Sequence, residues 1–142
     1  MNDSDQPQKK IKSTQTAFDI IEAIADRDRS SVTEIADEVG HSRSTVHYHL
    51  KTLQQNRYVV NDAEGFRLGL RMAHIGKLAL RKHQLSGIVE QTATELVEET
   101  DGVAHIAVNE GDKLTWLYRS GTTDSWDLPT DVGKQVGLHC TA

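Results

Sequence analysis

Hydrophobic residues recur at helical spacing in two neighbouring stretches near the N-terminus. Between Thr14 and Asp26 this spacing predicts an amphipathic helix whose buried side carries Phe18, Ile21, Ile24 and Ala25. Ser31 and Glu34 have the spacing of a capping box, which predicts that a second helix begins there. The apolar positions of this second helix are Val32, Ile35, Ala36 and Val39. Gly40 follows where a left-handed residue would end the helix.

A third helical pattern begins two residues after Gly40, with Ser42 as its expected N-cap and Asn56 as its expected end. Its apolar residues are Val46, Leu50 and Leu53. At 100° per residue these three positions lie within about 60° of one another and form one buried stripe. The same geometry places polar side chains on the opposite face, namely Ser44, His47, Tyr48 and Lys51, with Arg43 in the exposed first turn.

The rest of the chain alternates between strand-like and helical patterns. Tyr58–Val60 and Phe66–Leu68 predict a hairpin around a turn at residues 61–65. Leu70–Lys82 predicts a helix, and Leu85–Thr100 predicts another whose apolar stripe holds Leu85, Ile88, Val89, Leu96 and Val97. Val103–Asn109 and Lys113–Tyr118 predict a second hairpin, and the chain from Gly121 onward is expected to be loop-rich.

The order helix, short glycine turn, helix and hairpin is typical of a winged helix-turn-helix. The fold class expected from this order is α+β, beginning with an N-terminal winged helix-turn-helix. The expected boundaries are a disordered arm at 1–12 and a winged helix-turn-helix DNA-binding domain at 13–69, with the remaining helices and the second hairpin at 70–142. A winged helix built only for packing is the alternative, and the short turn, the cap and the following hairpin argue against it.

Charge is distributed unevenly along the 142 residues, whose formal net charge is −5. Residues 1–84 carry a net charge of +2 and residues 85–142 carry −7. Residues 39–61 contain Arg43, Lys51, Arg57 and three histidines but no acidic residue. In a chain with excess carboxylate, such a window favours contact with a polyanion. The acidic second part is interpreted as a solubility feature, with an acidic partner surface as the alternative.

Together the pattern and the charge predict binding of double-stranded DNA, with Arg43, Ser44 and Thr45 at the end of the helix that meets bases and phosphates, and with Lys51 and Arg57 on phosphate. A helix about 10–12 Å across fits the major groove and needs one apolar stripe and one polar face. The acidic tip of the hairpin, Asp62 and Glu64, is expected to repel phosphate, which argues against deep insertion of this wing. The alternative function is a protein-interaction or dimerisation module without a specific DNA target.

Several segments resemble one family of regulators. Residues 33–36, 42–47 and 66–69, with Leu50, Leu53 and Tyr58, resemble the N-terminal domain of IclR-type transcriptional regulators. Residues 137–142 resemble the segment that opens the core of that family's effector-binding domain. The resemblance assigns Arg43, Ser44, Thr45 and His47 to the turn that contacts bases and the DNA backbone. One departure is Tyr48, where the family commonly has arginine and where the phenol is expected to bond phosphate instead. Arg67 on the hairpin is expected to reach the DNA backbone.

A cytoplasmic location is expected because the single cysteine fits a reducing compartment and the N-terminus has no signal-peptide core. The resemblance implies a linker helix at 70–84 and, at 85–142, the N-terminal part of an effector-binding domain. The complete fold expected is then an N-terminal winged helix-turn-helix, a linker helix and an incomplete GAF-like α/β sensor domain. The resemblance also implies a homodimer or tetramer that represses or activates transcription in response to a small-molecule effector. It implies an effector site that includes His139, Cys140 and Thr141. The family's sensor continues beyond Ala142, so the chain is expected to be a truncated or a naturally short regulator. Its ligand pocket and the edge of the second hairpin are then expected to be left unfinished.

Other chemistries are not supported by the sequence. His47 and His49 diverge by about 200° on a helix, and with Cys140 as the single cysteine a zinc site is not expected. His139 and Cys140 with His105 as a base would suggest a thiol nucleophile, but a buried cysteine beside a loop histidine explains them better. We therefore expect no enzyme activity, metal or cofactor. The N-terminus has no apolar signal-peptide core, and no stretch has the roughly 20 apolar residues of a membrane span.

Overall fold

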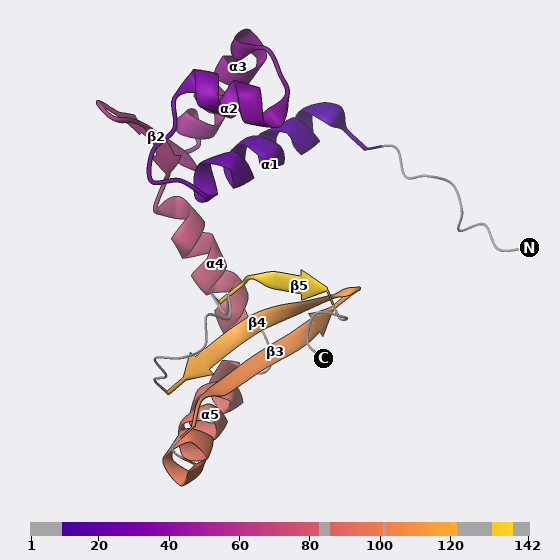
Figure 1. The fold of residues 1–142 in the computed structure, drawn as a ribbon, viewed down its shortest axis with the longest axis vertical. Helices are drawn as coiled ribbons and strands as arrows, with labels where there is room; N and C mark the ends of the chain where they lie inside the picture. The colour runs from indigo at the N-terminus through magenta and orange to yellow at the C-terminus, as the bar shows by residue number, and fades with distance from the viewer. Residues whose placement is uncertain (1–9, 83–85, 101, 122–131, 138–142) are drawn as a thin grey trace, which may run out of the picture. The chain divides into compact units, whose positions relative to one another are not determined.

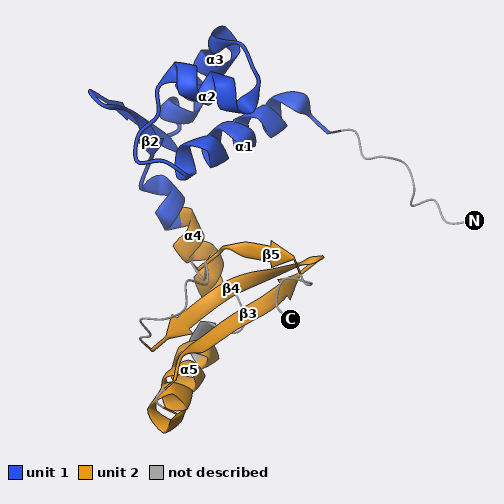
Figure 2. Cartoon of the chain, in the orientation of Figure 1, with its two compact units in different colours: residues 1–74 blue, residues 75–142 orange. Residues whose placement is uncertain are grey.

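The computed structural model describes residues 10–82, 86–100, 102–121 and 132–137. The chain has a mixed α+β fold that divides into two compact units, residues 1–74 and 75–142 (Figure 2). The division falls within α4 (Arg71–Lys82), inside the segment expected to be the linker helix. None of the helices in the described ranges is long and apolar enough to cross a membrane.

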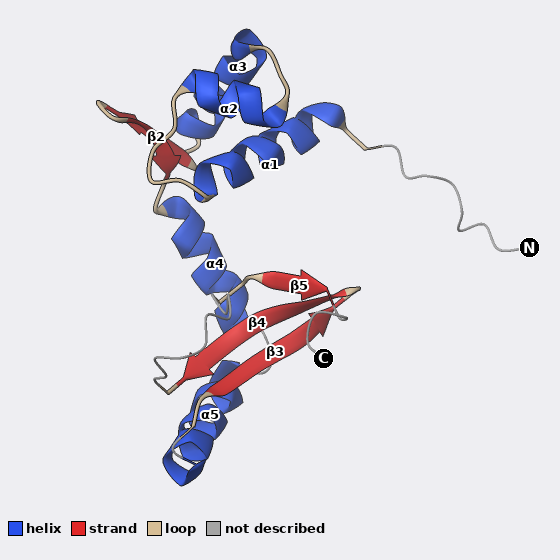
Figure 3. Ribbon diagram, in the orientation of Figure 1, coloured by secondary structure: helices blue, strands red, loops and turns tan. Residues whose placement is uncertain are grey.

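The first unit is a winged helix-turn-helix, as the sequence predicts. It contains α1 (Lys12–Ala25), α2 (Val32–Val39), α3 (Arg43–Gln55), β1 (Val59–Asp62) and β2 (Gly65–Leu68), in the order seen in Figures 1 and 3. Lys12 is already helical, so the expected arm of residues 1–12 is wrong at its C-terminal end; residues 1–9 lie outside the described part.

A capping box and a glycine fix the two ends of α2. The Ser31 side chain accepts from the Glu34 amide at 3.3 Å, and the Ser31 amide donates to the Glu34 carboxylate at 2.7 Å. The bond from the Ser31 amide is also the main reason that the pKa of Glu34 lies below its usual value. Gly40 ends α2 in the left-handed region at φ 68°, a conformation that glycine adopts without a steric penalty. These features confirm the predicted capping box and turn.

One hydrophobic core joins all five elements of the first unit. Its buried residues are Ile20, Ile24, Ile35, Ala36, Val46, Leu50, Leu53, Val59 and Phe66. The stripe predicted on the third helix is therefore confirmed, because Val46, Leu50 and Leu53 are all buried. The predicted face of α1 is wrong in part: Phe18 and Ala25 are exposed, whereas Ile20 and Ala23 are buried.

The β1–β2 wing is attached to the connection between α1 and α2. Its two strands pair antiparallel from Val59 opposite Leu68 to Asp62 opposite Gly65, so the turn is shorter than the sequence predicts. Ser30, which is buried, exchanges two backbone hydrogen bonds with Phe66, at 3.0 and 2.8 Å. The base of the wing is thus hydrogen-bonded to the segment that joins α1 to α2.

The second unit contains α5 (Ser86–Thr100), β3 (Ala104–Glu110), β4 (Lys113–Ser120) and β5 (Gln135–Gly137). The strands form an antiparallel sheet in the order β3-β4-β5, and α5 contacts β3 and β4. β5 pairs with β4 in the region expected to be loop, so the edge of the second hairpin at β4 is covered in part, contrary to expectation. Of the predicted α5 stripe, Val89 is buried but Ile88 and Leu96 are exposed, and Leu85 lies outside the described residues.

The stripe that holds α3 gives a stability test. We expect Leu50→Ala to lower the free energy of unfolding by about 2–5 kcal/mol, because it leaves a cavity at a side chain that is 1% exposed. Tyr48→Ala, at a side chain that is 71% exposed, should change it by less than about 0.5 kcal/mol. Denaturant unfolding followed by circular dichroism measures both values. Similar losses for both variants would contradict the orientation of α3.

Candidate nucleic-acid interface

One face of α3 is free of core contacts and carries polar side chains. Arg43, Ser44, His47, Tyr48 and Lys51 are all exposed, and Thr45 is half-buried. Val46 and Leu50 on the other side are 0% and 1% exposed. The helix therefore presents the predicted side chains outward, and no acidic residue lies on it or in the turns that flank it.

Hydroxyl groups organise the first turn of α3. The Ser42 side chain accepts from the Thr45 amide at 3.2 Å and lies 3.0 and 2.9 Å from the hydroxyls of Ser44 and Thr45. Ser42 thus caps the helix as predicted and fixes the two hydroxyl groups beside Arg43. Further along the helix, the rings of His47 and Tyr48 meet edge to face at 6.2 Å.

His41 connects the turn before α3 to the first helix, a role that the sequence analysis missed. Its Nε2 lies 3.2 Å from the hydroxyl of Thr16, a buried residue that also donates to the carbonyl of Lys12. No local sequence pattern marks this contact, because Thr16 and His41 are 25 residues apart along the chain. The contact holds the helix-turn-helix turn against α1.

Ion pairs at the wing bring its acidic and basic residues together. Asp62 lies 3.2 Å from Arg67 and 3.4 Å from Arg29, and Arg29 also lies 3.6 Å from Glu64. The Glu64 amide lowers the pKa of Asp62 most, and Arg67 and Arg29 lower it further, so the carboxylate stays charged. From the sequence Asp62 and Glu64 were expected to repel phosphate, and their pairing with Arg29 was not predicted. Their negative charge is balanced locally by the two arginines.

Arg57 ends α3 in an unusual backbone conformation. Its φ is 63°, and it is the one non-glycine residue with positive φ in the described part of the chain. The Tyr58 amide donates to the Leu53 carbonyl and the Arg57 amide donates to the Gln54 carbonyl, each at 2.9 Å, which is a Schellman motif. The position occupied by Arg57 in this motif is usually glycine, so arginine is held there at a steric cost.

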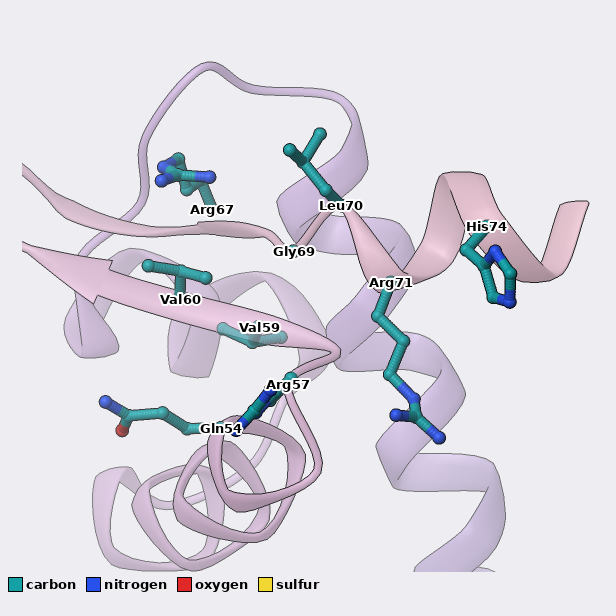
Figure 4. Close-up of a pocket in the computed structure, with 9 residues that line it drawn as sticks. All are labelled: Gln54, Arg57, Val59, Val60, Arg67, Gly69, Leu70, Arg71 and His74. Carbon is teal, nitrogen blue, oxygen red and sulfur yellow. The ribbon is translucent and has the colours of Figure 1, made fainter. Parts of the chain in front are cut away.

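A groove of about 540 Å³ adjoins this end of α3 (Figure 4). Figure 4 shows that its side chains come from the end of α3, from both strands of the wing and from the start of α4. The lining residues are Gln54, Arg57, Val59, Val60, Arg67, Gly69, Leu70, Arg71 and His74. The groove brings together two arginines of the predicted DNA site, Arg57 and Arg67, with Arg71 and His74, which the sequence analysis did not select.

The predicted effector residues His139, Cys140 and Thr141 lie outside the described residues. In the described part of the second unit, His105 meets Trp116 edge to face at 5.5 Å. Burial, and then the charge of Arg119, lowers the pKa of His105, which favours the neutral ring. Among the described residues, no cluster of histidine, cysteine and carboxylate side chains could hold a metal ion.

Known proteins contain a domain and full-length sequences that are similar to this chain. Residues 13–63 match the model of the IclR helix-turn-helix domain. The chain is 24% identical over 142 residues to the HTH-type transcriptional regulator KdgR of Dickeya chrysanthemi, a match that covers 99% of this chain and 47% of the relative. It therefore spans about half the length of this relative.

Solved structures of similar proteins support the same fold. The structure of Thermotoga maritima IclR has a TM-score of 0.73 at 20% identity and covers 92% of this chain and 54% of that chain. An IclR homolog from Microbacterium hydrocarbonoxydans, solved with 4-hydroxybenzoate, has a TM-score of 0.72 at 18% identity and covers 89% and 54%. At 20% and 18% identity, these comparisons show a similar fold and do not show a shared function.

The strained backbone at Arg57 can be tested by stability. We expect Arg57→Gly to raise the free energy of unfolding by about 0.5–1 kcal/mol, because relief of the left-handed strain exceeds the added entropy of the unfolded chain. The same change one residue earlier, Asn56→Gly, is made at φ −88° and should lower it by about 1 kcal/mol. Denaturant unfolding of both variants measures these shifts. A clear loss of stability in Arg57→Gly would show that no strain is stored there.

Proposed function

We propose, from the premise that residues 13–63 form an IclR helix-turn-helix domain, that this chain binds double-stranded DNA sequence-specifically and regulates transcription. The observation that carries this proposal is the two-sided character of α3. Its apolar stripe is buried to within 1% exposure at Val46 and Leu50, while Arg43, His47 and Lys51 on its other faces are exposed. A helix of this kind can enter a major groove without loss of core contacts.

The dimensions of α3 determine which of its residues meet bases and which meet the backbone. Its 13 residues extend about 20 Å, whereas the major groove is about 12 Å wide. In helix-turn-helix proteins the N-terminal residues of the recognition helix contact base edges. We therefore assign Arg43, Ser44 and His47 to the bases and adjoining phosphates, and Lys51 to the sugar–phosphate backbone.

The remaining predicted contacts follow from the chemistry of their side chains. Arg43 can donate two hydrogen bonds to a guanine edge, a geometry that a lysine ammonium does not reproduce. Thr45 and the phenol of Tyr48 can donate to phosphate oxygens. Arg57 precedes the wing and Arg67 lies on its second strand, and both can contact phosphate, although Arg67 shares its charge with Asp62.

The assembly and the ligand response belong to the same proposal. We infer a cytoplasmic homodimer or tetramer whose two-fold symmetry matches an inverted repeat, with half-sites about 34 Å or a multiple of it apart. A small-molecule effector would act through the complete sensor domain, with His139, Cys140 and Thr141 near its site. The structure of the Microbacterium hydrocarbonoxydans homolog contains 4-hydroxybenzoate, which supports a small organic ligand as the class of effector.

Two exposed basic residues of α3 provide the main test of DNA binding. We expect the double variant Arg43→Ala with Lys51→Ala to bind its DNA site about ten-fold or more weakly at 0.1 M salt, because charge-assisted contacts are lost. The matched control is Lys113→Ala with Arg119→Ala, which removes the same charge from exposed positions of the second unit. Fluorescence anisotropy measures the affinities, and circular dichroism checks the fold. Unchanged affinity in the α3 variant would contradict the assignment.

The DNA sequence used in this measurement is identified by selecting bound oligonucleotides from a random pool at two salt concentrations. Enrichment of an inverted repeat at both concentrations is the result expected for a sequence-specific regulator. Recovery of unenriched sequences, with binding lost at the higher salt, would favour non-specific charge attraction and contradict the proposal.

A further inference from the structure

We propose that the groove between the end of α3, the wing and the start of α4 binds a phosphate of the DNA backbone, through Arg57, Arg71 and His74. This inference rests on the proposed function and extends it, because it makes the first turn of α4 part of the DNA interface. The expected ligand is a phosphodiester of duplex DNA that flanks the bases contacted by α3.

The charge of the groove fits a phosphate. Three arginines and a histidine line it, and none of its lining residues is a carboxylate. Of the three arginines, Arg67 already has partners within the protein. Its Nε lies 3.2 Å from the Asp62 carboxylate, and another of its nitrogens donates to the Leu68 carbonyl. Arg57 and Arg71 are both exposed, and each offers several N–H donors that match phosphate oxygens.

The start of α4 is held in place beside the end of α3. The Gly69 amide donates to the Tyr58 carbonyl at 2.8 Å, and a Cβ at position 69 would collide with the carbonyl oxygen of Arg57. Glycine at this position lets the two backbone segments approach closely. The guanidinium of Arg71 then lies over the ring of Tyr58, 5.3 Å from its centre. Because a cation–π contact holds the group, less side-chain freedom is lost when phosphate binds.

The strain at Arg57 is a second and independent observation. Costly backbone conformations cluster at functional sites and persist where the surrounding structure holds them. Glycine would satisfy the Schellman motif at position 57 without strain, but it would remove a guanidinium from the groove. The left-handed backbone at Arg57 turns the chain after α3. The Arg57 side chain is one of those that line the groove.

The groove also lies where α3 would meet the backbone. In helical projection Gln54 is within about 20° of both Arg43 and His47, so one strip of α3 runs from its first turn to the groove. With the N-terminal end of α3 among the bases, about 8 Å of its 20 Å length extends past the 12 Å groove. The basic groove at that end therefore faces the neighbouring sugar–phosphate strand.

The consequence is a direct link between DNA occupancy and the linker helix. Arg71 and His74 are the first and fourth residues of α4. A phosphate bound by them and by Arg57 would fix the first turn of α4 against the winged helix. Any change that reorients this turn would then weaken the phosphate contact.

The test compares the salt dependence of DNA binding among variants of the full chain. The probe is a random-sequence duplex of about 30 base pairs, three helical turns, because phosphate contacts do not depend on sequence. We expect Arg71→Gln to bind about three- to ten-fold more weakly at 0.1 M salt and to reduce the slope of log K against log salt by about 0.9. Arg71→Lys should keep most of the slope, because a lysine still provides a point charge.

The matched control is Arg27→Gln, at an arginine of the same unit that pairs with Glu38 at 2.9 Å and lies outside the groove. Its slope should equal that of the wild type, and thermal melting should show all three variants folded. Equal slopes for Arg71→Gln and the wild type would overturn the inference. Absence of wild-type binding both to this duplex and to the oligonucleotides selected from the random pool would instead overturn the proposed function.

A second experiment distinguishes a phosphate of the DNA backbone from a free phosphate ion as the ligand of the groove. Inorganic phosphate is added at constant ionic strength, and the melting temperature is followed. Stabilisation of the wild type but not of Arg71→Gln, together with unchanged DNA slopes, would identify a site for a small anion and overturn the DNA contact. A reduced DNA slope without stabilisation by inorganic phosphate would support it.

Discussion

The burial of one stripe of α3 is the constraint on which the interface depends. Val46, Leu50 and Leu53 pack into a core shared with α1, α2 and the wing, and this fixes the rotation of α3 about its own axis. Its polar residues are then exposed because no other orientation keeps the stripe buried. Packing thus determines which residues can contact DNA, although none of those residues belongs to the core.

Most of the first unit could be predicted because its signals are local. The capping box at Ser31 and Glu34, the left-handed Gly40 and the N-cap at Ser42 each depend on residues within one turn. The error on α1 arose because apolar residues occur on both sides of that helix, so periodicity alone did not decide between Phe18 and Ile20. In the structure α2, α3 and β2 contact α1, and the side of α1 that carries Ile20 is the buried one.

Features that join distant segments could not be predicted in the same way. β5 is three residues long and is defined by its pairing with β4, about 20 residues earlier, so its sequence has no strand pattern of its own. The groove at the end of α3 needs three elements and the close approach at Gly69. The sequence indicated Arg57 and Arg67 by charge, but nothing local to Arg71 or His74 marks them as neighbours of those residues.

The bridge between Ser30 and Phe66 has a consequence for how the wing moves. Two short backbone hydrogen bonds attach β2 to the residue that precedes the cap of α2, and Phe66 itself is 9% exposed in the core. A hairpin joined in this way cannot swing as an independent flap. Its amides at the bridge should exchange with solvent only when the helical core opens, so the wing and the helices form a single cooperative folding unit.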